Sequence, residues 1–337
     1  MAMEDHHKRV NHPAGEIALA LGGGGMKGLA HIGVLKVLER EGFRIGAIAG
    51  TSAGGLIGAV YAAGYRPDEI EDILSNIDQT KMFGRRPNDG PSILGLAGLT
   101  RLLAELLGER TFADLSVPLA VTAVDARSGQ EIIVHNGNLV DAVLATAAVP
   151  GVFPPVTIGN ITLMDGGVLD PVPVSISRWL APTLPVVAVS LNAPPEKWAE
   201  LPPFYKLPIH IPGPMPIVER FSRLRLARAF NLFVQSVEYS SRLLSELRLQ
   251  IERPEVLIRP DVAMVGWLDR VDVHQVVAAG EEAARKALPD IRASLSWSNR
   301  IGRRLRRSFT PQANPVSLVA PVSHALGDPQ EADIDEP

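Results

Sequence analysis

A serine stands in a sharp turn between a predicted buried strand and a predicted helix. The apolar run 45–49 predicts the strand, and the apolar run 56–61 predicts the helix. Between them lies the sequence Gly50-Thr51-Ser52-Ala53-Gly54. Small residues avoid Cβ clashes in such a turn, so the serine hydroxyl projects alone above the strand end. The pattern predicts a nucleophile elbow around Ser52, although small residues at such a junction also occur for packing alone.

A glycine-rich loop follows the first predicted strand, at residues 16–21. The loop reads Gly22-Gly23-Gly24-Gly25-Met26-Lys27-Gly28, and a helix with apolar residues at 29, 32, 35 and 38 follows it, ending near Gly42. Consecutive glycines at a helix N-terminus expose backbone N–H groups and favour an anion. The loop therefore predicts a site for either a phosphate or the oxyanion of a reaction.

The phosphate alternatives fit the loop less well than the oxyanion. A Walker loop needs Ser or Thr after its lysine, whereas Gly28 follows Lys27. A dinucleotide site needs an acidic residue about 20 positions further on, where this chain has Gly50-Thr51-Ser52. The catalytic loop and Asp-Phe-Gly motif of a kinase are absent from the sequence. We therefore predict an oxyanion hole formed by Gly23, Gly24, Gly25, Met26, Lys27 and Gly28.

A third segment carries an aspartate into a glycine turn. Residues 161–168 predict a short strand that ends in Asp165-Gly166-Gly167. Asp-Gly by itself is ordinarily a structural turn, because both residues supply turn geometry at little cost. Its meaning therefore depends on the rest of the chain.

Taken together and in this order, the three segments resemble the patatin-like phospholipase family. Residues 146–155 are similar to the family's segment before its aspartate, and residues 256–261 to its late strand. The resemblance extends from about Glu16 to Leu288 and is strongest to compact bacterial members related to the esterase domain of neuropathy target esterase. Many relatives have an acidic residue where Gly22 stands and an arginine where Lys27 stands.

The resemblance implies a serine acyl hydrolase that cleaves lipid esters without a cofactor or metal. Ser52 would be the nucleophile and Asp165 its base, with Gly166 and Gly167 forming the aspartate turn. Phospholipid, lysophospholipid and simpler esters all remain open as substrates. The implied fold is α/β, a patatin-like three-layer sandwich with a mainly parallel central sheet and helices on both faces. The alternation of predicted strands and helices favours the same architecture.

A Ser-Asp-His triad is the alternative to the Ser-Asp dyad. A triad in the order Ser, Asp, His would need a histidine on a loop above the sheet. His31 and His274 lie within predicted helices, so His210, which stands between prolines, is the one credible rival. A non-catalytic lipid-binding or regulatory protein on the same fold is the alternative function.

Composition and charge exclude several other classes. The chain has 337 residues, 46% of them hydrophobic, a net charge of -4 and no cysteine, which excludes thiolate metal sites and a cysteine nucleophile. No basic patch with interleaved aromatics predicts nucleic-acid binding. The expected organisation is a polar leader at 1–14, a catalytic domain at 15–290 and a disordered tail at 291–337, which is basic and then proline-rich and acidic. The charged leader has no apolar signal region, which predicts a cytoplasmic protein.

Two helices and the tail carry apolar stripes outside the motifs. Residues 94–107 and 219–251 predict amphipathic helices, for which packing on the core is the ordinary role, although the first is also placed to cover an acyl pocket. In the tail, apolar residues recur every fourth position from Trp297 to Phe309, with five arginines between them. This pattern predicts peripheral contact with an anionic membrane at its inner face, and a disordered solvated tail is the alternative.

Overall fold

The computed structural model describes residues 14–85, 92–200 and 217–296, with side chains described in all but 217–231, 233 and 234. Its strands are β1 (Gly15–Leu21), β2 (Phe43–Gly50), β3 (Leu119–Asp125), β4 (Glu131–Val134), β5 (Val156–Ile158), β6 (Ile161–Asp165), β7 (Val186–Val189) and β8 (Val256–Ile258). Its helices are α1 (Ala30–Arg40), α2 (Ala53–Ala62), α3 (Pro67–Ser75), α4 (Ala97–Leu107), α5 (Leu139–Thr146), α6 (Val174–Leu180), α7 (Ile217–Glu252) and α8 (Val273–Ser294). Short 3₁₀ turns include η1 (Gly25–Leu29) and η4 (Gly166–Val168).

The strands form one mixed sheet in the order β5-β6-β3-β2-β1-β7-β8, with β4 paired to β3. The pairs β3–β2, β2–β1, β1–β7 and β7–β8 are parallel, whereas β4 and β6 run antiparallel to β3, and β5 runs antiparallel to β6. The central strands are buried over most of their length, as expected for a parallel sheet covered on both faces. The predicted α/β fold with a mainly parallel sheet is confirmed.

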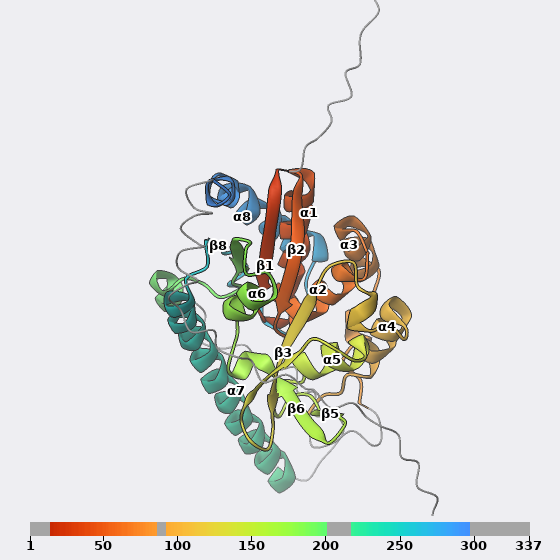
Figure 1. Ribbon diagram of the computed structural model, residues 1–337. Helices are drawn as coiled ribbons and strands as arrows, with labels where there is room; N and C mark the ends of the chain where they lie inside the picture. The colour runs from red at the N-terminus through yellow and green to blue at the C-terminus, as the bar shows by residue number, and fades with distance from the viewer. Residues whose placement is uncertain (1–13, 86–91, 201–216, 297–337) are drawn as a thin grey trace, which may run out of the picture.

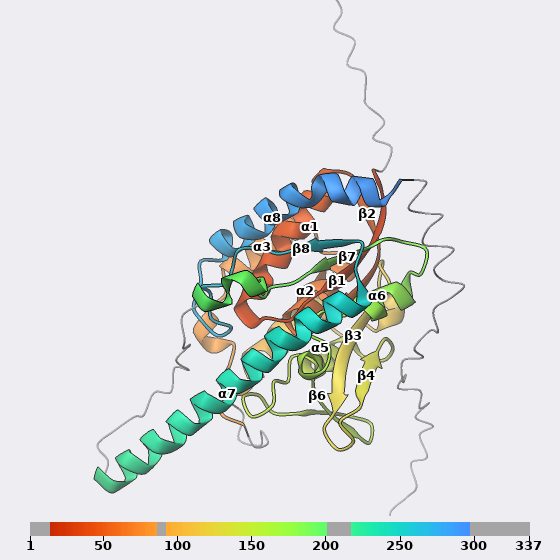
Figure 2. The same cartoon turned by 90° about the vertical axis from the view of Figure 1, so that its left-hand side faces the viewer.

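Helices cover the two faces of the sheet unequally (Figures 1 and 2). The larger core includes apolar side chains from α1, α2, α5 and α8, and it extends to Leu103 and Leu107 of α4. The smaller cores on the other face contain α6 and Leu249 of α7. The antiparallel strands β5 and β6 form the edge of the sheet beyond β3, away from α8 (Figure 1).

The sheet register brings the predicted serine and aspartate to the same level. Gly50, the last residue of β2, pairs with Val121 of β3. Two residues further along β3, Ala123 pairs with Asp165 at the end of β6. Because Ser52 lies two residues beyond Gly50, the chain leaving β2 reaches the level of Asp165 as it turns into α2.

Most predicted elements recur with shifted ends. The strand predicted at 45–49 is β2, which spans Phe43–Gly50, and the helix predicted at 94–107 is α4, which begins at Ala97. Asn138 caps α5 by accepting a hydrogen bond from the N–H of Asp141. The helix of α8 continues past Pro289 to Ser294. Among the described residues, no helix has both the length and the apolar character needed to cross a bilayer. The division into leader, catalytic domain and tail stays a prediction.

Candidate active site

Ser52 lies at the tight turn between β2 and α2 in a strained backbone conformation. Its φ of 52° and ψ of -120° are rare for a residue with a Cβ atom, and such strain costs about 1–3 kcal/mol. Two hydrogen bonds hold the turn: the N–H of Thr51 donates to the carbonyl of Leu21 at 3.0 Å, and the N–H of Ser52 donates to Oγ1 of Thr146 at 2.9 Å. The local fold therefore presents the Ser52 side chain at the end of the sheet.

The glycines of the elbow are required by close backbone contacts. A Cβ atom on Gly54 would lie 2.1 Å from the carbonyl oxygen of Leu21, and one on Gly50 would lie 2.6 Å from the backbone of Gly55. Thr51 is fully buried, and its hydroxyl donates to the carbonyl of Asp170 at 2.8 Å and lies 2.8 Å from Oγ1 of Thr122. These contacts with neighbouring parts of the protein hold the turn in place.

The glycine loop after β1 lies directly against the elbow. A Cβ atom on Gly23 would be 3.2 Å from the Cβ of Ser52, and one on Gly28 would be 2.4 Å from the Cβ of Ala53. Gly25 has a φ of 57°, and a Cβ atom there would lie 2.1 Å from the carbonyl oxygen of Trp267. The two glycine-rich segments that the sequence singled out are thus packed together around Ser52.

Hydrogen bonding divides the loop amides into two groups. The N–H of Gly23 donates to Pro171, that of Met26 to Trp267, and that of Lys27 to Gly24 at a long 3.3 Å. By contrast, the amides of Gly24 and Gly25 make no hydrogen bond to any described residue. Of the six residues predicted for an oxyanion hole, these two have donors available for a ligand.

His31 and Lys27 anchor the loop from inside the protein. Nε2 of the buried His31 donates to the carbonyl of Gly22 at 2.8 Å, and burial lowers the pKa of this imidazole to about 4 against the effect of that bond. His31 is therefore neutral near pH 7 and occupied by the backbone. The buried ammonium of Lys27 lies 3.8 Å from the carboxylate of Glu238 on α7, which ties the loop to that helix.

Asp165 ends β6 and is almost fully buried beside Ser52. Its Oδ1 accepts a hydrogen bond of 2.7 Å from the N–H of Gly167, and the Ser52 hydroxyl is close enough to influence the pKa of its carboxyl. Burial raises the pKa of the Asp165 carboxyl to about 6, although the Gly167 amide and the Ser52 hydroxyl act in the opposite direction. Gly166 is required next to it, because a Cβ atom there would lie 2.0 Å from Oγ1 of Thr122. A serine hydroxyl and a buried carboxylate with a raised pKa therefore lie in the wall of one cavity.

A cavity of about 230 Å³ opens over Ser52 and Asp165 and is lined mainly by apolar side chains. Leu96 and Leu99, from the start of α4, belong to its wall, while Leu103 and Leu107 of the same helix face the core. The helix therefore packs on the core, as its ordinary role predicts, and the residues at its start also form part of the cavity wall. The other apolar side chains of the wall include Leu56, Met82, Phe83, Val149, Phe153 and Leu268.

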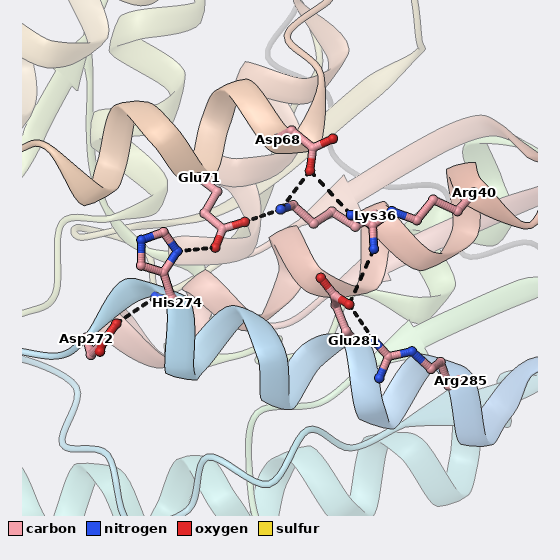
Figure 3. A network of polar contacts seen from close by, with 8 residues as sticks. All are labelled: Lys36, Arg40, Asp68, Glu71, Asp272, His274, Glu281 and Arg285. Carbon is pink, nitrogen blue, oxygen red and sulfur yellow. Dashed lines mark hydrogen bonds and ion pairs between the residues drawn. The ribbon is translucent and has the colours of Figure 1, made fainter.

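The histidines considered for a triad do not surround Ser52. Nδ1 of His274 lies 2.6 Å from Oε1 of Glu71, in a network of charged side chains that links α1, α3 and α8 (Figure 3). His274 is absent from the cavity wall, and His31 is bonded to the backbone. His210 lies outside the described residues, and so does the tail from Trp297 to Phe309.

Three residues that support the site were not singled out for it from the sequence. Thr146 binds the amide of Ser52, Thr122 contacts Thr51, and the carbonyl of Trp267 binds the amide of Met26. The threonines are 94 and 71 residues from their partners. Thr146 heads the segment that resembles the family's, which is a signal, but nothing local in the sequence distinguishes Thr122 or Trp267.

Comparison with known proteins gives a family match. Residues 19–177 match the patatin-like phospholipase family. An uncharacterized NTE family protein of Mycobacterium tuberculosis is 35% identical over 179 residues, which cover 52% of this chain and 49% of that protein. An uncharacterized protein of Bacillus subtilis is 33% identical over 210 residues, covering 52% of this chain and 70% of that protein.

One similar protein has a named activity. The lysophospholipase NTE1 of Debaryomyces hansenii is 29% identical over 169 residues, which cover 47% of this chain and 11% of that protein. The chain spans about half the length of the mycobacterial relatives it matches, at 49% and 47% of two of them. The residues of this chain that match the family include the glycine loop, the elbow and the aspartate turn.

Proposed function

Because the chain belongs to the patatin-like phospholipase family, we propose that it hydrolyses carboxylic ester bonds of lipids through Ser52 and Asp165. The observation that carries the proposal is the placement of a strained serine against a buried aspartate, beside two backbone amides without partners among the described residues. The chemistry that these groups support is acyl transfer to water.

In the first half of the reaction, the Ser52 oxygen attacks the ester carbonyl while its proton moves to Asp165. The negative charge that develops on the carbonyl oxygen is stabilised by the amides of Gly24 and Gly25 and by the N-terminus of α2 at Ala53. As the tetrahedral intermediate collapses, Asp165 returns the proton to the leaving alcohol. The acyl group remains on Ser52.

In the second half, Asp165 takes a proton from water as the water oxygen attacks the acyl-serine. Collapse of the second intermediate releases the fatty acid and returns the proton to Ser52. An aspartate with an ordinary pKa near 3.9 is a poor base for an alcohol, and a pKa raised to about 6 improves it. Burial of Asp165 therefore serves the reaction directly.

The apolar wall of the cavity favours a long-chain acyl group as the part of the substrate bound there. Phospholipids and lysophospholipids are the substrates that we propose first, and the similarity to the lysophospholipase NTE1 of Debaryomyces hansenii supports the second of these. Simple esters with short acyl groups bury less apolar surface, and we expect them to be hydrolysed with a lower kcat/KM.

Turnover of p-nitrophenyl butyrate, followed by a lipid panel analysed by mass spectrometry, tests this function. We expect hydrolysis by the wild type and background rates for Ser52→Ala. Ser241→Ala is the matched control, because Ser241 lines the same cavity and has no part in the mechanism. No turnover of any ester by the folded wild type would favour a non-catalytic lipid-binding protein. Loss of activity in Ser241→Ala but not in Ser52→Ala would identify Ser241, in place of Ser52, as the nucleophile.

A further inference from the structure

The outer side of α7 carries no charged side chain along its described length. Five large side chains there expose between 47% and 77% of their surface: Leu232, Tyr239, Leu243, Leu247 and Ile251. Successive members are seven, four, four and four residues apart, which places them on one side of the helix. We call these five residues the α7 outer face. The other exposed side chains from 232 to 251 are Ser236, Val237, Ser240 and Gln250.

The charged residues of the same stretch point inward and are paired with the body of the protein. Glu246 receives two hydrogen bonds from Arg259, at 2.7 and 2.9 Å. Arg248 lies 3.1 Å from the carboxylate of the fully buried Asp170 and donates to the carbonyl of Leu169 at 2.9 Å. The remaining ones, Glu238, Arg242 and Glu252, are also engaged in ion pairs.

This arrangement is the reverse of a solvated surface helix, which turns its charges to water and its apolar stripe to the core. Contiguous exposed apolar side chains of this kind mark surfaces that contact another molecule. In the two views, α7 runs along one side of the body, and no other described helix or strand covers its outer side (Figures 1 and 2). The described part of the chain therefore leaves this surface open.

The open surface is continuous with the mouth of the cavity above Ser52. Val237 is both exposed and part of the cavity wall, and Glu238 and Ser241 of the same helix line the cavity as well. Val168, three residues from Asp165, is another exposed apolar residue of the cavity wall. A body seated on the α7 outer face would thus lie beside the entrance through which an ester reaches the serine.

We propose that the α7 outer face is a docking surface for lipid bilayers, and that its apolar side chains insert among uncharged headgroups. The inference rests on the proposed function, since a membrane would hold the substrate at the cavity mouth. Insertion of apolar side chains at the interface requires no cation on the inserted face, so binding depends on buried apolar area.

A second copy of the chain fits this surface less well. Paired helices commonly use charges that flank the apolar seam to set register and orientation. On α7 the described charges are already used within the protein. The membrane is therefore the occupant to which the uncharged surface and its position at the cavity mouth both point.

Co-sedimentation of the full chain with phosphatidylcholine vesicles tests the proposal. A Ser52→Ala background prevents lipid hydrolysis and makes binding independent of catalysis. We expect binding that is insensitive to salt and a loss of about tenfold or more in the double variant Leu243→Glu/Leu247→Glu. The matched control is Gln275→Glu/Ala278→Glu, which adds two carboxylates to exposed positions of α8 and should bind as the parent does.

Four outcomes would overturn the proposal. Equal vesicle binding by both double variants would place the contact elsewhere, and binding only to anionic vesicles with strong salt dependence would point to basic residues. A dimer in sedimentation velocity that Leu243→Glu/Leu247→Glu converts to monomer, without vesicle binding, would assign the surface to a second copy. Wild-type turnover of p-nitrophenyl butyrate without vesicle binding would leave the proposed function standing and remove this inference alone.

Discussion

Two parts of the molecule gather polar side chains closely, and they use them differently. In the network between α1, α3 and α8, Lys36 pairs with Asp68 at 2.7 Å and with Glu71, which also contacts His274 (Figure 3). In the cavity, by contrast, Ser52 is strained, Asp165 has a raised pKa, and two amides have no partner among the described residues. The network pairs its charges and holds helices together, whereas the cavity keeps unsatisfied groups available for chemistry.

The largest effect that tests this contrast is expected from the two groups proposed for catalysis. Ser52→Ala and Asp165→Asn should each lower ester turnover by about a thousandfold or more, and the double variant should lose little beyond either single one. The reason is that both side chains act on one proton. The measurement is kcat/KM on one ester. If the loss in the double variant equalled the product of the two single losses, the two residues would act independently.

A smaller loss is expected from a Cβ atom in the loop. In Gly24→Ala the new methyl group would lie 2.8 Å from Cδ1 of Leu191, the end of a side chain rather than backbone, so we expect the fold to survive with a shift of the loop amide. We expect kcat to fall by about a hundredfold with KM little changed, because the oxyanion forms in the transition state.

The control for this variant is Gly84→Ala, whose nearest neighbour would be 3.9 Å away, and it should leave both constants unchanged. Gly25 is unsuitable for this test, because a Cβ atom would lie 2.1 Å from the carbonyl of Trp267. A raised KM with unchanged kcat in Gly24→Ala would assign the loop to ground-state binding instead.

The smallest effects are expected from two histidines, His31 beside the glycine loop of the cavity and His274 in the charged network. His31→Ala should lower the free energy of unfolding by about 2–4 kcal/mol and reduce turnover, because it opens a cavity and frees the carbonyl of Gly22. His274→Ala should cost less than about 1 kcal/mol and leave turnover unchanged, because its side chain is 66% exposed. Chemical denaturation and ester assays measure both, and a larger loss of turnover in His274→Ala would break the contrast.

Local patterns in the sequence sufficed for the parts of the fold that depend on neighbours in the chain. The glycines at 50 and 54 indicated the elbow because a tight turn excludes Cβ atoms, and the apolar runs indicated β1 and β2 because buried parallel strands need them. The bond from the Ser52 amide to Thr146 joins residues 94 apart, and no local pattern encodes such a distance.

The helix α7 shows the limit of periodicity most directly. Its apolar and charged residues alternate with helical spacing, and that spacing is the same whichever side faces the core. Packing on the core was the ordinary expectation for the apolar stripe, yet Leu243 and Leu247 lie outside while Glu246 lies inside. The partner of Glu246, Arg259, belongs to a separate element, so the sequence alone could not predict which side would be buried.

The rate at which a fluorophosphonate labels the protein, measured against pH with the adduct mapped by mass spectrometry, tests the central claim most directly. Asp165 accepts the proton of Ser52 only when ionised, and its pKa is raised to about 6, so labelling should be fast above that pH and fall as pH drops below it. The adduct should lie on Ser52, and Asp165→Asn should remove both the labelling and its pH dependence. An adduct on another residue, or wild-type labelling in Asp165→Asn, would contradict the account.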